Sequence, residues 1–227
     1  METPLLKRIR VWDLPTRVFH WALALSMVSL VVTAKFGGSL MVWHYRLGML
    51  VLSLIAFRVL WGLLGGRWSR FASFIYAPAT IWRYLRGRTR PTEYLEVGHD
   101  PVGSLLIFAL LGGACLQLAT GLVADDEIAN QGPLNRFVSS GVAQWATSWH
   151  KTWGQWLLMA LVALHVAAIF YFVSKKRQNL VGSMVKGDKT LPAGTPVSAD
   201  GLAQRALGLL LWLACLAAAV WVFSLGA

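Results

Sequence analysis

The sequence has few charged residues and very few acidic ones. Only 14% of its 227 residues are charged, and ten of them are Asp or Glu. Hydrophobic residues make up 56% of the chain, and twelve residues are tryptophan. This balance argues against a soluble protein and places the chain among integral membrane proteins.

Cysteine is also scarce. The two cysteines, Cys115 and Cys215, each lie in the middle of an apolar segment. Neither belongs to a Cys-x-x-Cys-His motif, which excludes covalently attached haem. A disulfide is not expected at membrane depth, so both residues are interpreted as small packing residues.

The long apolar stretches contain no acidic residue. Five stretches are long enough to cross a hydrocarbon core of roughly 30 Å as helices. The absence of Asp and Glu from them argues against carboxylate-ligated metal sites and against the carboxylate relay of an ion transporter. We expect one helical bundle and one appended helix. The expected spans are Val18–Ala34, Met41–Leu64, Val102–Val123, Thr152–Val173 and Ala206–Phe223.

The basic residues are distributed unevenly along the chain. Sixteen of the 21 Lys and Arg residues lie before the first span, between spans two and three, or between spans four and five. The positive-inside rule makes these segments cytoplasmic, with the N-terminus inside and the C-terminus outside. A basic rim attracts anionic lipid headgroups, so the net charge of +11 requires no nucleic acid partner. Ser69–Arg90 mixes aromatic residues with arginines and is expected to be a partly helical segment on the cytoplasmic leaflet.

Four of the five histidines lie inside the expected spans or at their edges, where an ionisable side chain marks a functional site by default. Span one runs outward and span two returns, which places His20 near the cytoplasmic face and His44 near the outer face. Span four runs inward from His150, and His165 lies about 22 Å deeper. Any one of these residues alone could be an interfacial histidine. Depth, however, pairs His20 with His165 and His44 with His150.

Each pair suits the two axial positions of a haem iron. Zinc and iron–carboxylate sites would instead take three or four protein ligands. A haem also needs a smooth surface beside its ligands. His44 and His150 are each followed by a glycine four residues later. These glycines are Gly48 and Gly154, and span three adds Gly121 as part of a smooth wall, so we predict cofactor contacts at all three.

Two further residues have more than one interpretation. Arg58 lies about 21 Å deeper than His44 on span two, level with the inner pair, where a guanidinium group would bind a haem propionate. The alternative is an arginine that extends to the inner interface. His99 precedes span three in a polar turn, where Asp100 is a natural helix cap and Pro101 begins the helix. It is interpreted as a loop residue, and a third ligand site is the alternative.

An ordered set of motifs resembles the bacterial cytochrome b561 family, which includes the membrane cytochrome b subunits of nickel-iron hydrogenases. The resemblance covers about residues 8–190. It implies a four-helix bundle (residues 1–180) that holds two b haems ligated by His20, His44, His150 and His165. The residue pattern adds a polar cytoplasmic linker (181–204) and a fifth transmembrane helix (205–227), which is not part of the family's minimal core. The motifs are Trp12-Asp-Leu-Pro-Thr-Arg-Val-Phe-His20-Trp, His44-Tyr-Arg-Leu-Gly48, Gly98-His-Asp-Pro-Val-Gly103, Ala119-Thr-Gly-Leu122 and Ala163-Leu-His165-Val.

The resemblance implies an electron carrier of the bacterial inner membrane that works between quinone or quinol and a redox partner, often periplasmic. We expect a c-type cytochrome with a basic docking face to bind the outer loop Asp125–Trp149, which begins with three acidic residues. The alternative is that these acids only cap span three. A membrane anchor or electron-transfer subunit of a larger oxidoreductase, such as a nickel-iron hydrogenase, is the rival function, and whether the chain is itself an enzyme stays open.

Overall fold

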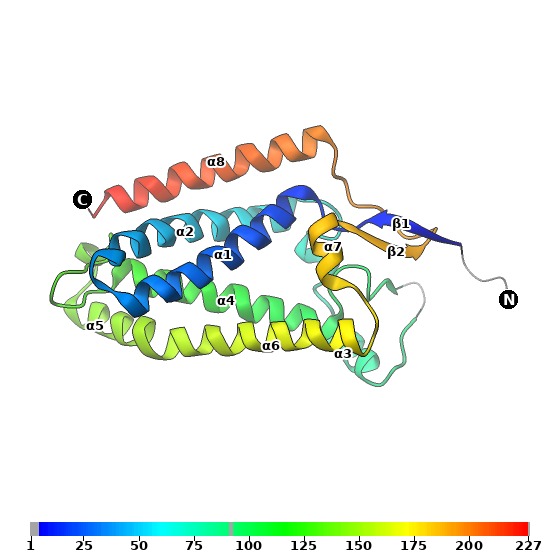
Figure 1. Ribbon diagram of the computed structural model, residues 1–227, viewed down its shortest axis with the longest axis horizontal. Coiled ribbons are helices and arrows are strands. Elements are labelled where there is room, and N and C mark those ends of the chain that lie inside the picture. The colour runs from blue at the N-terminus through cyan, green and yellow to red at the C-terminus, as the bar shows by residue number, and fades with distance from the viewer. Residues whose placement is uncertain (1–4, 91–92, 227) are drawn as a thin grey trace. The chain divides into compact units, whose positions relative to one another are not determined.

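A computed structural model describes residues 5–90 and 93–226 (Figure 1). Within this part of the chain, five helical segments are long and apolar enough to cross a membrane. The fourth is composite, because α5 (Ser140–Ser148) continues through a five-residue π-helical turn, Trp149–Trp153, into α6. The protein is therefore an all-α, multi-pass membrane protein, as the sequence predicts. The other long helices are α1 (Leu14–Phe36), α2 (Met41–Leu64), α4 (Pro101–Val123) and α8 (Leu202–Ser224), and α6 is Gly154–Ser174.

The connection between the third and fourth spans is shorter than predicted. We expected a loop over Asp125–Trp149, but its second half is α5. This short helix buries Ala143 and Ala146. Residues three apart share one face of a helix, so two small residues at this spacing let α5 pack closely against its surroundings.

The chain divides into two compact units, and each is described by itself. The first consists of Met1–His20, Arg58–Ile107 and Val166–Leu210. The second consists of Trp21–Phe57, Phe108–His165 and Leu211–Ala227.

The first unit contains a strand pair that the sequence did not predict. Strand β1 (Leu6–Arg10) pairs antiparallel with β2 (Asp188–Pro192), with Leu6 opposite Pro192 and Arg10 opposite Asp188 (Figure 1). The segment expected to be a polar linker (181–204) thus contains regular structure, namely most of α7 (Leu180–Lys186) and all of β2. A small core beside the strands is built from Val11, Trp12, Trp68 and Val97. The segment expected on the cytoplasmic leaflet is partly helical, with α3 at Pro78–Leu85.

Asp13 is the polar centre of the first unit and is fully buried. Its Oδ1 accepts hydrogen bonds from the Thr16 backbone amide (2.8 Å) and from Trp61 Nε1 (3.0 Å). Its Oδ2 accepts from the Gly66 amide (3.1 Å) and from the Ser69 hydroxyl (2.6 Å). The carboxyl group therefore caps the start of α1 and ties it to the end of α2 and the turn that follows.

The second unit contains the core of a four-helix bundle. Leu23 of α1 packs against a buried cluster formed by α2, α4 and α6, whose members are Val51, Ile55, Ala114 and Leu158. Helix α8 contributes no residue to this cluster and packs outside it, where the Phe223 ring approaches the Cα of Gly48. Four helices thus share the core and the fifth is appended, as the sequence predicts.

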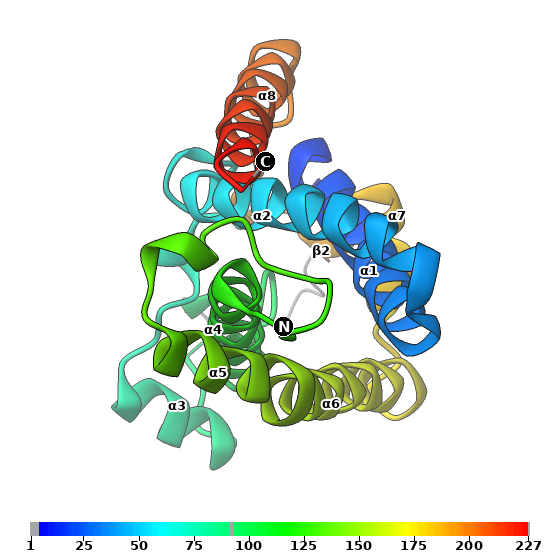
Figure 2. The same ribbon diagram turned by 90° about the vertical axis from the view of Figure 1, so that its left-hand side faces the viewer.

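In the second unit, residues 124–139 form the loop between α4 and α5, drawn in green in Figure 2. Asp126 accepts hydrogen bonds from the Asn130 side chain and from the backbone amides of residues 128–130. These bonds hold the pKa of Asp126 well below its usual range. Thr147 of α5 accepts from the Asp125 amide and donates to the Asp125 carbonyl, which fixes the loop three residues before His150.

Candidate metal centre

Two of the four predicted ligands, His44 and His150, face each other within the second unit. His44 lies on the first turn of α2, and His150 lies in the π-helical turn between α5 and α6. Their ring centroids are 6.2 Å apart and their ring planes are nearly perpendicular, at 86°. Both side chains are partly buried.

Each of these rings is held through its Nδ1 by the preceding or neighbouring helix. His44 Nδ1 lies 3.2 Å from the Leu30 carbonyl oxygen and 3.2 Å from the Thr33 hydroxyl, both on α1. His150 Nδ1 lies 2.9 Å from the Gln117 carbonyl oxygen on α4. A carbonyl oxygen can only accept, so both Nδ1 atoms carry the proton and both Nε2 atoms keep a lone pair for a metal.

This geometry fits a metal with two axial imidazoles. A bond of about 2 Å from Nε2 to the metal places each ring centroid about 3 Å from it, so two such rings on opposite sides of one metal are about 6 Å apart. The observed separation of 6.2 Å agrees. In the described residues, no group of three or more His, Cys, Asp or Glu side chains is arranged to hold a metal ion. The site therefore suits a haem iron better than zinc.

The three predicted cofactor-contact glycines have different neighbours. A Cβ at Gly121 would lie 2.7 Å from Cε1 and 3.0 Å from Nδ1 of His150, so glycine lets this ring lie directly against α4. A Cβ at Gly154 would collide with the side-chain oxygen of Gln117, and one at Gly48 would lie 3.9 Å from Phe223. Gly154 and Gly48 thus also make room for protein side chains, and the predicted haem contacts of the three glycines stay a prediction.

The other two predicted ligands belong to different units. His20 is the last residue of the first segment of the first unit, and His165 lies on α6 in the second unit; both are partly buried. Arg58, in the first unit, is only 4% exposed, so its guanidinium group does not extend to an interface. It lies over the rings of Phe71 (4.7 Å) and Phe74 (6.0 Å). Within the described part of the chain, its buried Nη1 atom has no hydrogen-bond partner, which is the environment expected of a group that binds an anionic ligand.

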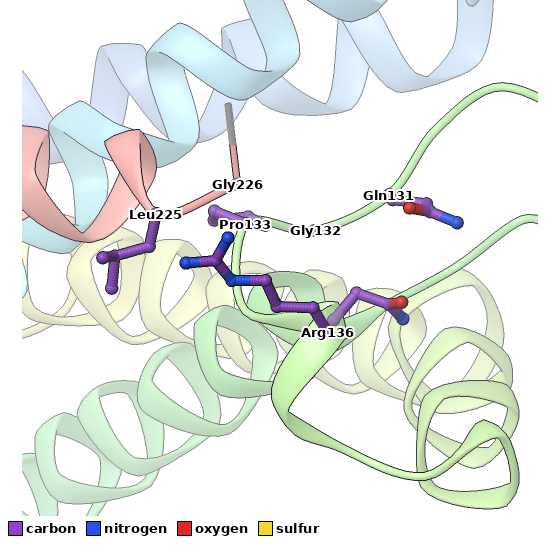
Figure 3. Close-up of a pocket in the computed structure, with 7 residues that line it drawn as sticks. Gln131, Gly132, Pro133, Arg136, Leu225 and Gly226 are labelled. Atoms are coloured by element: carbon purple, nitrogen blue, oxygen red, sulfur yellow. The ribbon is translucent and has the colours of Figure 1, made fainter.

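His99 belongs to the first unit, whereas His44 and His150 belong to the second. Its ring packs between Trp12 (4.9 Å) and Phe74 (4.6 Å) in the first unit, and its carbonyl accepts from the Tyr76 hydroxyl. As expected, Asp100 caps α4, because its Oδ1 accepts from the amides of Val102 and Gly103. A pocket in the second unit, beside the end of α8, contains none of the predicted site residues (Figure 3). It is lined by Gln131, Gly132, Pro133, Asn135, Arg136, Leu225 and Gly226.

Sequence reasoning missed the residues that hold the two rings. Gln117 contributes both a carbonyl oxygen and a side-chain amide to the surroundings of His150. The available signal was an amide side chain in an apolar span, because a polar group at membrane depth needs partners. Thr33 gave a weaker signal, since a threonine hydroxyl also bonds within its own helix, as this one does to Ser29.

Comparisons with known proteins find a matching family and several relatives. Residues 11–187 match the model of a family described as prokaryotic cytochrome b561. A protein of Azotobacter chroococcum mcd 1, named as a probable Ni/Fe-hydrogenase B-type cytochrome subunit, is 28% identical over 79% of this chain and 87% of its own length. A protein of the same name from Cupriavidus necator is 26% identical over 82% of this chain and 88% of its own length. A probable Ni/Fe-hydrogenase 1 B-type cytochrome subunit of Escherichia coli K12 is 23% identical over 78% of this chain and 88% of its own length. No solved structure matches the chain.

Proposed function

We propose, from the premise that this chain belongs to the prokaryotic cytochrome b561 family, that it carries electrons between quinone or quinol and a redox partner at the periplasmic face of the bacterial inner membrane. The family and the membrane-spanning helices make it a membrane cytochrome b of electron transfer. The observation that carries the proposal further is the pair of Nδ1-anchored imidazoles, His44 and His150.

In this proposal, His44 and His150 bind one b haem through their Nε2 atoms. A b haem supplies one-electron redox chemistry at a potential set by its ligands and their surroundings. The Leu30 and Gln117 carbonyls keep each imidazole in the tautomer that can bind iron, and they fix the direction of each ring. The bare backbone at Gly121 keeps His150 close to α4.

A second haem would be held by His20 and His165. Arg58 would donate from its buried guanidinium group to a propionate of that haem, which would satisfy its Nη1. The distribution of basic residues supports an orientation with the N-terminus in the cytoplasm and the C-terminus in the periplasm. His20 and His165 then lie toward the cytoplasm, and His44 and His150 lie toward the periplasm.

A second candidate function is that of a subunit in a stable complex with a periplasmic oxidoreductase. The names of the relatives favour it, because they are B-type cytochrome subunits of Ni/Fe-hydrogenases. The two candidates differ in how the partner is held. A subunit stays with its partner through purification at high salt, whereas a carrier meets its partner in encounters that salt weakens.

The purified full-length protein is expected to contain two non-covalent haems per chain, both reducible by a quinol. Two histidine pairs provide four axial ligands, which is enough for two haems. The measurement is the haem-to-protein ratio by pyridine haemochrome, followed by anaerobic addition of a quinol analogue. A ratio of one would leave one histidine pair without a metal. Two haems that no quinol reduces would contradict the quinone part of the proposal.

Removing the negative charge of the outer loop is expected to slow electron exchange with a basic partner by about tenfold at low ionic strength. The reason is that a negatively charged surface patch attracts a positively charged partner and raises the rate of association. The variant is the triple change Asp125→Asn, Asp126→Asn and Glu127→Gln. Amides are chosen because these side chains also shape the loop: Asp125 accepts from Gln131, and Glu127 accepts from Gln144. Stopped-flow reduction of a basic c-type cytochrome measures the effect.

The control for this experiment is Glu96→Gln. Glu96 also lies outside the spans, but its proposed position is on the cytoplasmic face, so the control should exchange electrons at the parental rate. The haem spectra should be parental in both variants. Equal rates in the triple variant and the parent at low salt would exclude the loop as the docking surface and would leave the acids with their structural bonds alone.

A further inference from the structure

One turn of α4 lies against the His150 ring and holds it, although α4 itself carries no histidine. The carbonyl oxygen of Gln117 accepts the proton of His150 Nδ1, at 2.9 Å. The missing side chain of Gly121 leaves room for the ring. The buried Thr120 hydroxyl lies 3.0 Å from the same Gln117 carbonyl and 2.9 Å from that of Leu116, so it fixes the carbonyl from the other side.

The side chain of Gln117 makes a second bond to the same histidine. Its Nε2 donates to the backbone carbonyl of His150, at 2.8 Å. His150 is part of the π-helical turn Trp149–Trp153, which is closed by the Gly154 amide bonding to the Trp149 carbonyl. A π turn contains one residue more than an α turn and is frequently found at functional sites. Gln117 therefore holds both the ring and the backbone of the residue on which the turn is built.

The other end of the Gln117 amide is directed at Gly154. Its Oε1 is buried and, among the described residues, has no hydrogen-bond partner. A Cβ on Gly154 would collide with this oxygen and would also come within 2.7 Å of Trp149 Nε1. The absence of a side chain at Gly154 is thus what allows Gln117 to lie beside the π turn. The four-residue spacing from His150 to Gly154 is explained here by the packing of a protein side chain.

We propose that Gln117 is the positioning residue of the outer haem ligand. It fixes the tautomer of His150 through its carbonyl oxygen, and it fixes the π turn that aims the ring at His44 through its side-chain amide. This inference rests on the proposed function, in which His44 and His150 bind one haem. Gln117 acts through His150 and makes no contact with the metal.

The test is the change Gln117→Leu in the full-length protein with both haems bound. Leucine is of similar size and apolar, so it suits a membrane span, but it cannot donate to the His150 carbonyl. We expect the affinity for the outer haem to fall about 10-fold to 100-fold, as for other residues that orient a metal ligand, measured by haem transfer to apomyoglobin. The low-field g value of that haem in the ferric EPR spectrum should shift as well, because it depends on the angle between the two imidazole planes, here 86°.

A second variant displaces the Gln117 side chain without changing Gln117 itself. Gly154→Ala keeps every hydrogen-bonding group but places a methyl group against Gln117 Oε1, so it should reproduce the EPR shift of Gln117→Leu. The matched control is Gln155→Leu, the same exchange on α6, where the amide lies 3.9 Å from the Met159 sulfur. This control should match the parent.

The outcomes separate this inference from the function on which it rests. A parent protein without a haem at His44 and His150 would contradict the proposed function itself. A parent with that haem, and a Gln117→Leu variant with the parental affinity and EPR spectrum, would overturn the role of Gln117. Loss of both haems in Gln117→Leu would assign the residue to the folding of the whole chain and would also overturn it.

Discussion

Replacing His150 with alanine is expected to lower the haem content from about two per chain to about one, and replacing His44 should remove the same haem. The two rings face each other at 6.2 Å in one compact unit, so in the proposed function each would be the other's counterpart on one metal. Loss of either imidazole leaves iron with one axial ligand or leaves the pocket empty. Redox titration of each variant should therefore lack the same component, and His20→Ala and His165→Ala should both lack the other.

The matched control is His99→Ala. This histidine belongs to the first unit and packs against Trp12 and Phe74. Both haems should remain in this variant, which also tests the alternative that His99 is a third ligand. If His44→Ala and His150→Ala removed different components of the titration, the assignment of these two residues to one haem would be wrong.

Replacing Asp13 with alanine is expected to destabilise the protein by at least about 3 kcal/mol, because each buried donor left without an acceptor costs about 1–3 kcal/mol. Four donors lose their acceptor at once: two backbone amides, the Trp61 indole and the Ser69 hydroxyl. The inner haem should be lost first, because Asp13 caps the helix that carries His20. The measurement is thermal unfolding in detergent, followed by the absorbance of each haem.

Asp188→Asn is the control for this experiment. The carboxylate of Asp188 pairs with Arg8 and Arg10 at the protein surface, and such ion pairs contribute about 0–1 kcal/mol. Its melting temperature should lie close to that of the parent. If the Asp13→Ala variant had the same melting temperature as the parent, water would have replaced the lost carboxylate as the hydrogen-bond acceptor. The environment of Asp13 would then be accessible to water.

The helices were predictable because their signal is strong and local. An apolar run of about 20 residues has few structures available in a membrane, so the predicted and observed bounds of the second span agree at Met41–Leu64. The pairing of His44 with His150 was predictable from their depth in the membrane, because the two residues lie near the ends of their spans that are on the same side. Their role as metal ligands stays a prediction.

The π turn, the strand pair and the Asp13 centre were not predictable from the sequence. A π turn has no residue signature, so a regular helix was assumed between His150 and His165, and one extra residue in a turn rotates a side chain by about 100°. Strands β1 and β2 are five residues each and lie at opposite ends of the chain. The carboxylate of Asp13 accepts locally from the amide of Thr16, and its other bonds depend on the tertiary fold.

The pairing of β1 with β2 constrains the path of the chain through the bilayer. Two strands joined by backbone hydrogen bonds must lie in the same aqueous compartment, so the chain between Arg10 and Asp188 crosses the membrane an even number of times. Helices α1, α2 and α4 and the composite segment of α5, the π turn and α6 make four crossings, which is an even number. Counting α5 and α6 as separate crossings would give five, which the strand pair excludes. Helix α8 is a fifth candidate crossing, so this parity supports the proposed orientation, with the N-terminus and the C-terminus on opposite sides of the membrane. Because β2 is made after all four earlier spans, β1 has no partner until they have been synthesised.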